Sequence, residues 1–373
     1  MRTSSFNLCS FAISLIIAGC SGSGGGSELG IGGSTAGGAA NTGGGVAIAT
    51  GGDATGGKES AGVGTVTTGG SKATGGSGAA TKKFVGNITT TYSGSADYNG
   101  MKYAKYWDQI TPENAGKWGS VQSSATSAFN WATLDSIYKY TQTNSIMFKQ
   151  HTFVWGSQQP SGTVTQAIVE NWIKTFCSRY PATQLIDVVN EPPPHTTPAY
   201  ASALGAGETG TYGWITKAFK LARQYCGSAI LILNDYNNIE YGDQETHFID
   251  IVTQIKAAGA PIDAVGAQAH DANKLTAATL QANLNTMNSK TSLPVYITEY
   301  DVSNASDSGQ LATYQSQFPI FLNTDFIKGI TIWGWIVGQT WSQAPNSGLV
   351  SGTTARPAMT WLMGQLGRPV PPN

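Results

Sequence analysis

Short apolar runs alternate with longer amphipathic stretches from Phe84 onward, and this alternation limits the folds open to the chain. Runs such as 230–233 are apolar at every position, which is typical of strands buried on both faces of a parallel sheet. Helical patterns lie between most runs, for example over 165–180, 211–225 and 244–258. Eight such units in about 290 residues predict a closed (β/α)8 TIM barrel, with a doubly wound open sheet as the alternative. The expected strands are 84–85, 106–110, 146–148, 185–189, 230–233, 264–267, 295–297 and 330–333.

Polar or aromatic side chains follow six of the runs at their C-terminal ends. They are His151, Asn190 with Glu191, Asn234 with Asp235, Gln268 with His270, Glu299 with Asp301, and Trp333. The C-terminal ends of barrel strands meet at one rim, where active sites are built. Solvation alone does not explain the same pattern after so many strands. We therefore predict a functional site on this rim.

Two glutamates, Glu191 and Glu299, directly follow apolar strand runs. A charged group at the end of such a strand is costly unless it has a use. Two carboxyl groups that face each other across a cleft suit glycoside hydrolysis. One protonates the leaving oxygen, and the other attacks the anomeric carbon or activates water. A pair of exposed loop glutamates without a catalytic role is the alternative.

The residues around these glutamates narrow the prediction. The motifs DVVNEP at 187–192 and ITEYDV at 297–302 resemble the two catalytic strand ends of glycoside hydrolase family 10. That family consists chiefly of endo-β-1,4-xylanases with retaining chemistry on a (β/α)8 barrel. Further segments resemble the family in the same order along the chain, at 111–118, 151–155, 234–237, 268–270 and 333–341.

The resemblance implies a role for each matching residue. Glu191 would be the general acid/base and Glu299 the nucleophile, so that xylan is cleaved internally with net retention. Asn190 would donate to the sugar 2-hydroxyl, and His270, bonded to Asp301, would keep Glu299 ionised. The implied sugar-binding residues are Glu113, Asn114, Lys117, His151, Trp155, Asn234, Gln268, Trp333 and Trp341. The expected substrate is xylan or a xylo-oligosaccharide, and this chemistry requires no cofactor or metal.

Some positions depart from the family pattern. Gly156 stands where the family usually has His, Val337 where it has Asp, and Ala115-Gly116 where it has Glu-Met. Prolines at 192–194 are also unusual, and they would stiffen the loop beside Glu191. No catalytic residue is lost, so the departures concern which chain lengths and side groups of the substrate the site accepts. The alternatives are a related retaining β-glycanase acting on another polysaccharide, a non-catalytic polysaccharide-binding module, and a structural surface lipoprotein.

The first 80 residues differ from the rest. Residues 1–20 combine Arg2, an apolar run and small residues before Cys20, which is the pattern of a secretory signal. The sequence IAGC at 17–20 resembles a bacterial lipobox and implies cleavage before a lipidated Cys20; an ordinary signal peptide is the alternative. Residues 21–80 hold 23 glycines in 60 positions and predict a flexible linker, because they cannot bury enough apolar surface to fold. The catalytic barrel is expected over 81–373 of an exported protein, tethered to a membrane through Cys20.

The remaining cysteines, Cys177 and Cys226, each lie at the end of a predicted helix. An even pair in an exported protein favours a disulfide, with two buried free thiols as the alternative. The net charge of -1 argues against nucleic acid as a partner, and ten Trp with 12% charged residues suit a neutral, ring-shaped ligand. A monomer is expected.

The sequence leaves the positions of a few single residues open or places them away from the site. Lys117 fits a solvated surface position as well as the site, and Trp335 fits either the barrel rim or a sugar-stacking position. Asp187 is either a support behind the site or a buried structural residue. His195 is expected at the surface.

Overall fold

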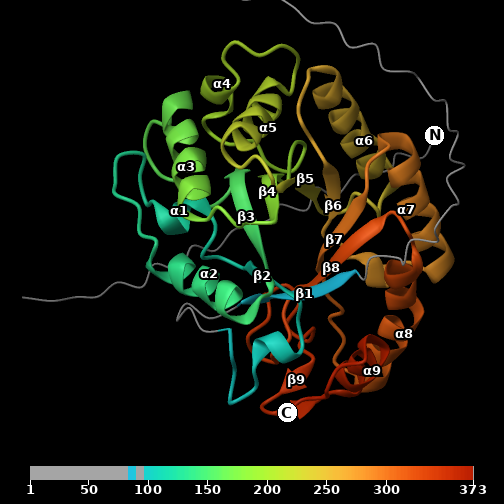
Figure 1. Cartoon of the computed structure of the whole chain (residues 1–373). Coiled ribbons are helices and arrows are strands. Elements are labelled where there is room, and N and C mark those ends of the chain that lie inside the picture. Colours follow the sequence, from blue (N-terminus) through green and yellow to red (C-terminus); the bar gives the residue numbers. More distant parts are fainter. Residues whose placement is uncertain (1–82, 90–95, 373) are drawn as a thin grey trace, which may run out of the picture. The chain divides into compact units, whose positions relative to one another are not determined.

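The described residues of the computed structural model, 83–89 and 96–372, form a closed barrel of parallel strands. Each strand pairs with the next along the chain, and β8 pairs with β1 through Val85 and Ile330. Figure 1 shows the strands inside a ring of helices. The closure confirms the (β/α)8 barrel and excludes the open sheet, which would leave two edge strands unpaired. The strands are β1 (Phe84–Thr89), β2 (Gln109–Pro112), β3 (Met147–Trp155), β4 (Leu185–Asn190), β5 (Ile230–Asp235), β6 (Ala264–Ala267), β7 (Val295–Tyr300) and β8 (Ile327–Ile332).

Helices follow most strands and cover the outside of the barrel. They are α1 (Trp118–Val121), α2 (Ala132–Asn144), α3 (Gln166–Arg179), α4 (Ala201–Leu204), α5 (Gly213–Tyr225), α6 (Gly242–Ala257), α7 (Ala277–Thr291), α8 (Asp307–Asn323) and α9 (Pro357–Leu366). Two 3-10 turns, Tyr103–Lys105 and Ala272–Lys274, and a small hairpin, β9 (Val350–Ser351) with β10 (Thr354–Ala355), complete the described part. The three helices predicted over 165–180, 211–225 and 244–258 are confirmed within about two residues at each end.

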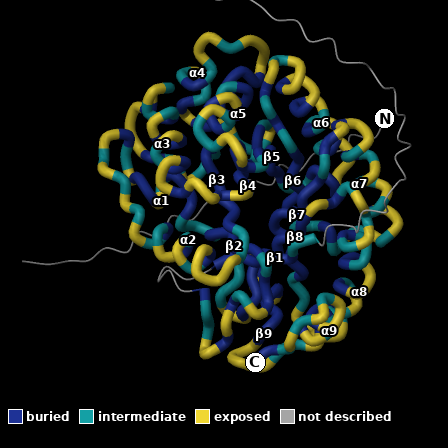
Figure 2. The backbone as a smooth tube through the Cα atoms, in the orientation of Figure 1, coloured by how far each residue is buried: buried dark blue, intermediate teal, exposed yellow. Residues whose placement is uncertain are grey.

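The core lies between the strands and the inner faces of the helices, and exposed residues lie mainly on the outer helices and loops (Figure 2). Helix α5 illustrates why the pattern predicted helices. Ile215, Phe219 and Ala222 recur at a spacing of four and three residues and are fully buried. This apolar face packs on β4, and burial of each large side chain contributes roughly 1.5–3 kcal/mol.

The predicted strand at 106–110 was wrong at its start, because β2 begins only at Gln109. Tyr106 and Trp107 precede the strand and are buried against Trp335, with ring centroids 5.8 and 6.1 Å away. An apolar aromatic pair fits a buried connection as well as a strand, and the sequence alone does not separate the two. Trp335 itself is 3% exposed within this aromatic group, so its rim-packing interpretation is the right one.

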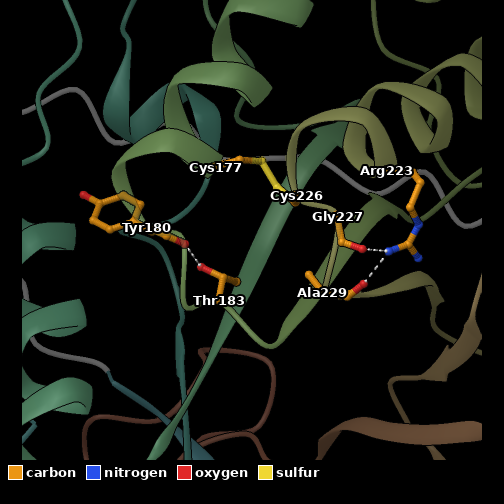
Figure 3. Close-up of a disulfide and its surroundings, with 7 residues drawn as sticks. All are labelled: Cys177, Tyr180, Thr183, Arg223, Cys226, Gly227 and Ala229. Atoms are coloured by element: carbon orange, nitrogen blue, oxygen red, sulfur yellow. Dashed lines mark hydrogen bonds between the residues drawn. A yellow bond between two sulfur atoms is a disulfide. The ribbon is translucent and has the colours of Figure 1, made fainter. Parts of the chain in front are cut away.

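A disulfide joins Cys177, near the end of α3, to Cys226, directly after α5 (Figure 3). The two Cα atoms are 5.2 Å apart, and 49 positions separate the residues in sequence. Arg223 donates to the carbonyl oxygens of Gly227 and Ala229 just beyond it, at 2.7 and 3.1 Å. Because both helices end where the next strand begins, the disulfide lies at the opposite end of the barrel from the rim that carries Glu191.

The predicted signal segment 1–20 and the predicted linker 21–80, including Cys20, lie outside the described residues. Across residues 83–89 and 96–372, no helix combines the length and apolar character needed to cross a membrane.

Candidate active site

Glu191 and Glu299 lie at the same rim, at the ends of β4 and β7. Glu299 is the fifth residue of β7 and is 4% exposed. Glu191 directly follows β4, and its N–H donates to the carbonyl oxygen of Asn234 at 2.8 Å. Glu191 has a φ of 50°, a left-handed conformation that costs a non-glycine residue about 1–2 kcal/mol. Its surroundings must therefore hold it in place.

A series of side-chain amides links the two carboxyl groups. Asn234 Nδ2 donates to Glu299 Oε1 and to Asn190 Oδ1, both at 2.8 Å. Gln268 Nε2 then donates to Asn190 Oδ1 at 3.3 Å and to Glu191 Oε1 at 3.4 Å. The structure thus brings these five predicted site residues into one buried network.

Sequence reasoning missed Thr298 as a member of this network. Its hydroxyl donates to Asn234 Oδ1 at 2.6 Å, which turns the amide nitrogen of Asn234 toward Glu299. The threonine is the residue before Glu299 in β7, and it is 1% exposed. A polar residue in an otherwise apolar strand run was the signal that could have found it.

Glu299 is surrounded by groups that carry or donate protons. His270 Nε2 lies 3.3 Å from Glu299 Oε2, and His270 Nδ1 lies 2.9 Å from Asp301 Oδ2. Since both ring nitrogens face carboxylate oxygens, both carry hydrogen and the ring is an imidazolium. His151 Nδ1 lies 4.0 Å from Glu299 Oε1 on the other side.

A second buried group of charges lies behind His151. Asp187 Oδ2 is 2.9 Å from His151 Nδ1 and 2.8 Å from Lys149 Nζ, and all three residues are at most 2% exposed. Asp187 therefore supports His151 behind the site and is also a buried residue paired with Lys149, so both of its interpretations apply. Lys149 was not predicted, and its position three residues into an apolar strand was the available signal.

These contacts have opposite effects on the two glutamates. Burial raises the pKa of Glu299, but the hydrogen bond from His270 and the positive charges of His151, His270 and Lys149 outweigh it and lower the pKa to about 2. Burial lowers the pKa of His270, but Asp301 and Glu299 reverse this and raise it to about 10. Glu299 is consequently held ionised.

Glu191 has neutral donors instead. Trp155 Nε1 donates to Glu191 Oε2 at 2.8 Å, and Gln268 donates to the other oxygen. Burial raises the pKa of Glu191, the negative charge of Glu299 raises it further, and the hydrogen bonds from Trp155 and Gln268 only partly oppose them. A proton is therefore retained on Glu191 at a pH where Glu299 is charged.

Lys117 is 7% exposed, which excludes the solvated surface position for it. Its Nζ donates to Asn114 Oδ1 at 2.9 Å and lies 5.0 Å from the ring centroid of Trp155. Glu113 is partly buried beside it, and burial raises the pKa of that carboxyl group against the opposing charge of Lys117. A small pocket opens between Lys117, Trp155 and Gln158. This side of the rim offers both charged and aromatic groups to a ligand.

The two predicted tryptophans after β8 lie beside His151 and His270. Trp333 is 4% exposed, and its ring centroid lies 5.3 Å from that of His151. Trp341 is more exposed, and its ring lies 4.7 Å from that of His270. Together with the residues after β2 and β3, they line the site on the β8-to-β3 side of the barrel.

His195 was expected at the surface, and this prediction was wrong. Its Nδ1 lies 2.7 Å from Asp235 Oδ1, its Nε2 lies 2.7 Å from Gln244 Oε1, and its ring stacks on Tyr236 at 3.7 Å. Burial raises the pKa of Asp235 to about 7 against the opposing contact with His195. The loop after Glu191 folds back onto β5 and α6, which the linear sequence does not reveal.

No group of three or more His, Cys, Asp or Glu side chains in the described residues is placed to hold a metal ion. At the rim, His270 pairs with Glu299 and Asp301, and Lys117 donates to the neutral Asn114. The arrangement consists of one carboxyl group whose pKa is lowered and a neighbouring one whose pKa is raised, flanked by amide and aromatic side chains. A fold and site of this kind define a carbohydrate-cleaving barrel enzyme.

The comparisons with known proteins agree with this class. The family model described as Glycosyl hydrolase family 10 matches residues 77–363. Endo-1,4-beta-xylanase B of Cellvibrio japonicus is 45% identical over 289 residues, which cover 76% of this chain and 45% of that protein. Endo-1,4-beta-xylanase C of Phanerodontia chrysosporium is 28% identical over 72% of this chain and 70% of its own length. This chain thus spans less than half the length of the Cellvibrio protein.

Solved structures give the same fold. Native xylanase 10B from Thermotoga maritima has a TM-score of 0.64 at 22% identity, covering 76% of this chain and 94% of that one. A family 10 structure from Paenibacillus barcinonensis has a TM-score of 0.65 at 22% identity, covering 78% and 97%. Both support the barrel alone. The match of the family model over most of the chain shows that it belongs to glycosyl hydrolase family 10.

Proposed function

We propose that this protein is an endo-1,4-β-xylanase that hydrolyses internal β-1,4 bonds of xylan with net retention. The observation that carries the proposal is a pair of carboxyl groups linked through Asn234 and Gln268, whose neighbours lower the pKa of Glu299 and raise that of Glu191. Retaining glycosidases need this division of roles. The choice of xylan is supported by the names of the related proteins, which are endo-1,4-beta-xylanases.

In the first step, a carboxylate oxygen of Glu299 attacks the anomeric carbon, and the bond from that carbon to the leaving oxygen breaks. The proton of Glu191 moves to the leaving oxygen, so the departing sugar leaves as a neutral alcohol. In the second step, Glu191 takes a proton from water, whose oxygen attacks the same carbon and releases Glu299. Two inversions give net retention.

The other predicted site residues have supporting roles in this proposal. Asn190 donates to the sugar 2-hydroxyl through its free amide nitrogen, since Asn234 and Gln268 already occupy its oxygen. His270, bonded to Asp301, keeps Glu299 charged. Glu113, Asn114, Lys117, His151, Trp155, Gln268, Trp333 and Trp341 bind sugars on the non-reducing side.

The test is hydrolysis of soluble xylan, cellulose and mannan by the full chain, with Glu299→Gln as the inactive variant. Glu245→Gln is a matched control, because Glu245 is also a buried glutamate, 8% exposed, but lies on α6. We expect sugar release from xylan by the wild type and by the control, and none by Glu299→Gln. Proton NMR of the first products should show the β-anomer.

Other outcomes identify the alternatives. Release from cellulose or mannan but not from xylan would indicate a related β-glycanase. Binding without hydrolysis of any of the three would indicate a polysaccharide-binding module. First products in the α-configuration would contradict the retaining mechanism.

We also infer that the chain is exported and anchored by a lipid on Cys20, with 21–80 as a tether and a monomeric barrel over 81–373. The basis is the sequence of the first 80 residues. Mass spectrometry of the mature N-terminus in a bacterial host should find acylated Cys20. Cys20→Ala should release the protein from the membrane fraction. An unmodified mature N-terminus at another residue would contradict the lipid anchor. Light scattering of the released protein should give the mass of a monomer.

A further inference from the structure

Thr196 ties the end of β3 to the backbone of Glu191. Its hydroxyl donates to the carbonyl oxygen of Glu191 at 2.6 Å, and its own N–H donates to the same oxygen at 3.1 Å. The hydroxyl oxygen also accepts from the N–H of Gly156 at 3.3 Å. Gly156 directly follows β3, so one threonine side chain connects the ends of two neighbouring barrel strands.

This contact acts on the residue with the unfavourable backbone. Glu191 has a φ of 50°, and its N–H is held by the carbonyl oxygen of Asn234. Thr196 holds its carbonyl group from the other side. With both flanking peptide groups fixed, the direction in which the Glu191 side chain leaves the backbone is fixed as well.

Position 156 has no room for a side chain. A Cβ atom there would lie 2.6 Å from Thr196 Cβ, 2.8 Å from Thr196 Oγ1 and 2.9 Å from the nitrogen of Thr197. Thr196 fills the space that a side chain at 156 would need. The glycine and the threonine are therefore two parts of one arrangement in this structure.

The same strand end also holds the carboxyl group. Trp155, next to Gly156, donates from its indole nitrogen to Glu191 Oε2 at 2.8 Å. The side chain of Glu191 is therefore held by Trp155, and its backbone is held by Gly156 through Thr196. If the loop after β4 moves away from β3, the bond from Trp155 to Glu191 and the bond from Gly156 to Thr196 are lost together.

We propose that Thr196, seated against Gly156, is a positioning residue that orients the acid/base Glu191 from the end of β3. The proposal rests on the proposed role of Glu191, but its geometric part does not depend on activity. Loss of the Thr196 hydroxyl should leave the Glu191 carbonyl with only the weaker bond from the N–H of residue 196 and remove the link to Gly156, so that the carboxyl group can turn away from Trp155.

The kinetic test compares leaving groups. In Thr196→Val, which keeps the shape of the side chain, kcat/KM on xylo-oligosaccharides should fall about tenfold, because the leaving sugar needs the proton of Glu191. With 2,4-dinitrophenyl xylobioside, whose leaving group needs no proton, kcat/KM should stay within about twofold. Thr196→Ser, which keeps the hydroxyl, should have the wild-type kcat/KM on xylo-oligosaccharides.

The matched control is Thr197→Val, since Thr197 is the exposed neighbour in the same loop. Thr197→Val should leave kcat/KM unchanged on both substrates. An equal loss on both substrates in Thr196→Val would show a general structural role and overturn the proposal, as would no loss on either.

A second measurement is independent of catalysis. The indole N–H of Trp155 gives its own signal in a 1H–15N spectrum, assigned by Trp155→Phe, and this signal reports the bond to Glu191. Thr196→Val should move it, and Thr197→Val should not. An unmoved indole signal overturns the proposal, even if the wild type proves inactive on every polysaccharide and the proposed function fails.

Gly156→Ala tests the other half of the arrangement without removing the hydroxyl. Its methyl group should displace Thr196 and reproduce both the leaving-group difference and the indole shift. Gly364→Ala on α9 is the matched control, because no atom beyond the backbone of its own helix and its two chain neighbours lies within 4 Å of the added carbon there. The contrary result is a folded Gly156→Ala enzyme that keeps the wild-type kcat/KM on both substrates and the wild-type indole signal of Trp155. That result would show that the close contact between Gly156 and Thr196 does not position Glu191.

Discussion

Glu299 and Glu191 are carboxyl groups at the ends of strands of the same barrel, but their neighbours differ in charge. Glu299 has the imidazolium of His270 at 3.3 Å and His151 at 4.0 Å, whereas Glu191 has the neutral donors Trp155 and Gln268. Burial raises the pKa of both groups, and only at Glu299 do charges reverse it. One fold thus shifts the pKa values of two identical side chains in opposite directions.

The largest expected effect comes from removing the charge of Glu299. Glu299→Gln should lower kcat on xylan at least about a thousandfold, because no carboxylate remains to attack the anomeric carbon. It should also lower the pKa of Glu191 toward its ordinary value of 4.5, since the negative charge of Glu299 is one cause of its elevation. Titration by 13C NMR measures this. An unchanged pKa of Glu191 would show that burial alone accounts for the elevation.

Removing the imidazolium should have the next largest effect. His270→Asn should lower kcat/KM about a hundredfold by leaving Glu299 and Asp301 without their shared cation. Activity requires ionised Glu299, so the rate falls as the pH drops through its pKa, about 2 in the wild type. Without His270 this pKa rises, and the acid limb of the pH–rate profile should move to higher pH. An unmoved acid limb would contradict the role of His270.

The disulfide lies at the far end of the barrel and should affect stability but not chemistry. Replacing Cys177 and Cys226 with serine should lower the free energy of unfolding by about 2–4 kcal/mol, because the open chain regains loop entropy. Denaturant unfolding measures this, and kcat on xylan should be unchanged. A loss of kcat as large as that of His270→Asn would mean that the two ends of the barrel are coupled.

The smallest effect is expected at an exposed ion pair between α2 and α3. Arg179 bonds Asp135, with the two side chains 44% and 39% exposed. Asp135→Asn should change the free energy of unfolding by less than about 1 kcal/mol, because solvent screens such pairs. Kinetics on xylan should not change. A loss comparable to that of the disulfide variant would show that this contact holds the two helices together.

Much of the fold and the central pair was predictable from local pattern. Continuous apolar runs and amphipathic helices predicted the closed barrel, and the runs that end in Glu191 and Glu299 placed both groups on one rim. The cysteine pair followed from helices that are neighbours in the repeat. These predictions held because they depend on burial and on residues close together in sequence.

The errors and omissions have a different cause. Tyr106 and Trp107 were assigned to a strand, although they pack on Trp335 more than 200 residues away. His195 was assigned to the surface, although Asp235 and Gln244 hold it. Each depends on a partner at least 40 residues away, and no local pattern identifies that partner.

The sequence by itself determined the barrel, the rim and the two glutamates, because strand periodicity and strand-end chemistry are properties of short segments. Only the tertiary structure decided how the two glutamates come to differ, because Lys149 and His151 on β3 and His270 after β6 gather around Glu299, whereas the nearest donors of Glu191 are neutral. It also decided that Gly156 and Thr196 belong together, since their contact forms only when the loop after β4 folds against the end of β3.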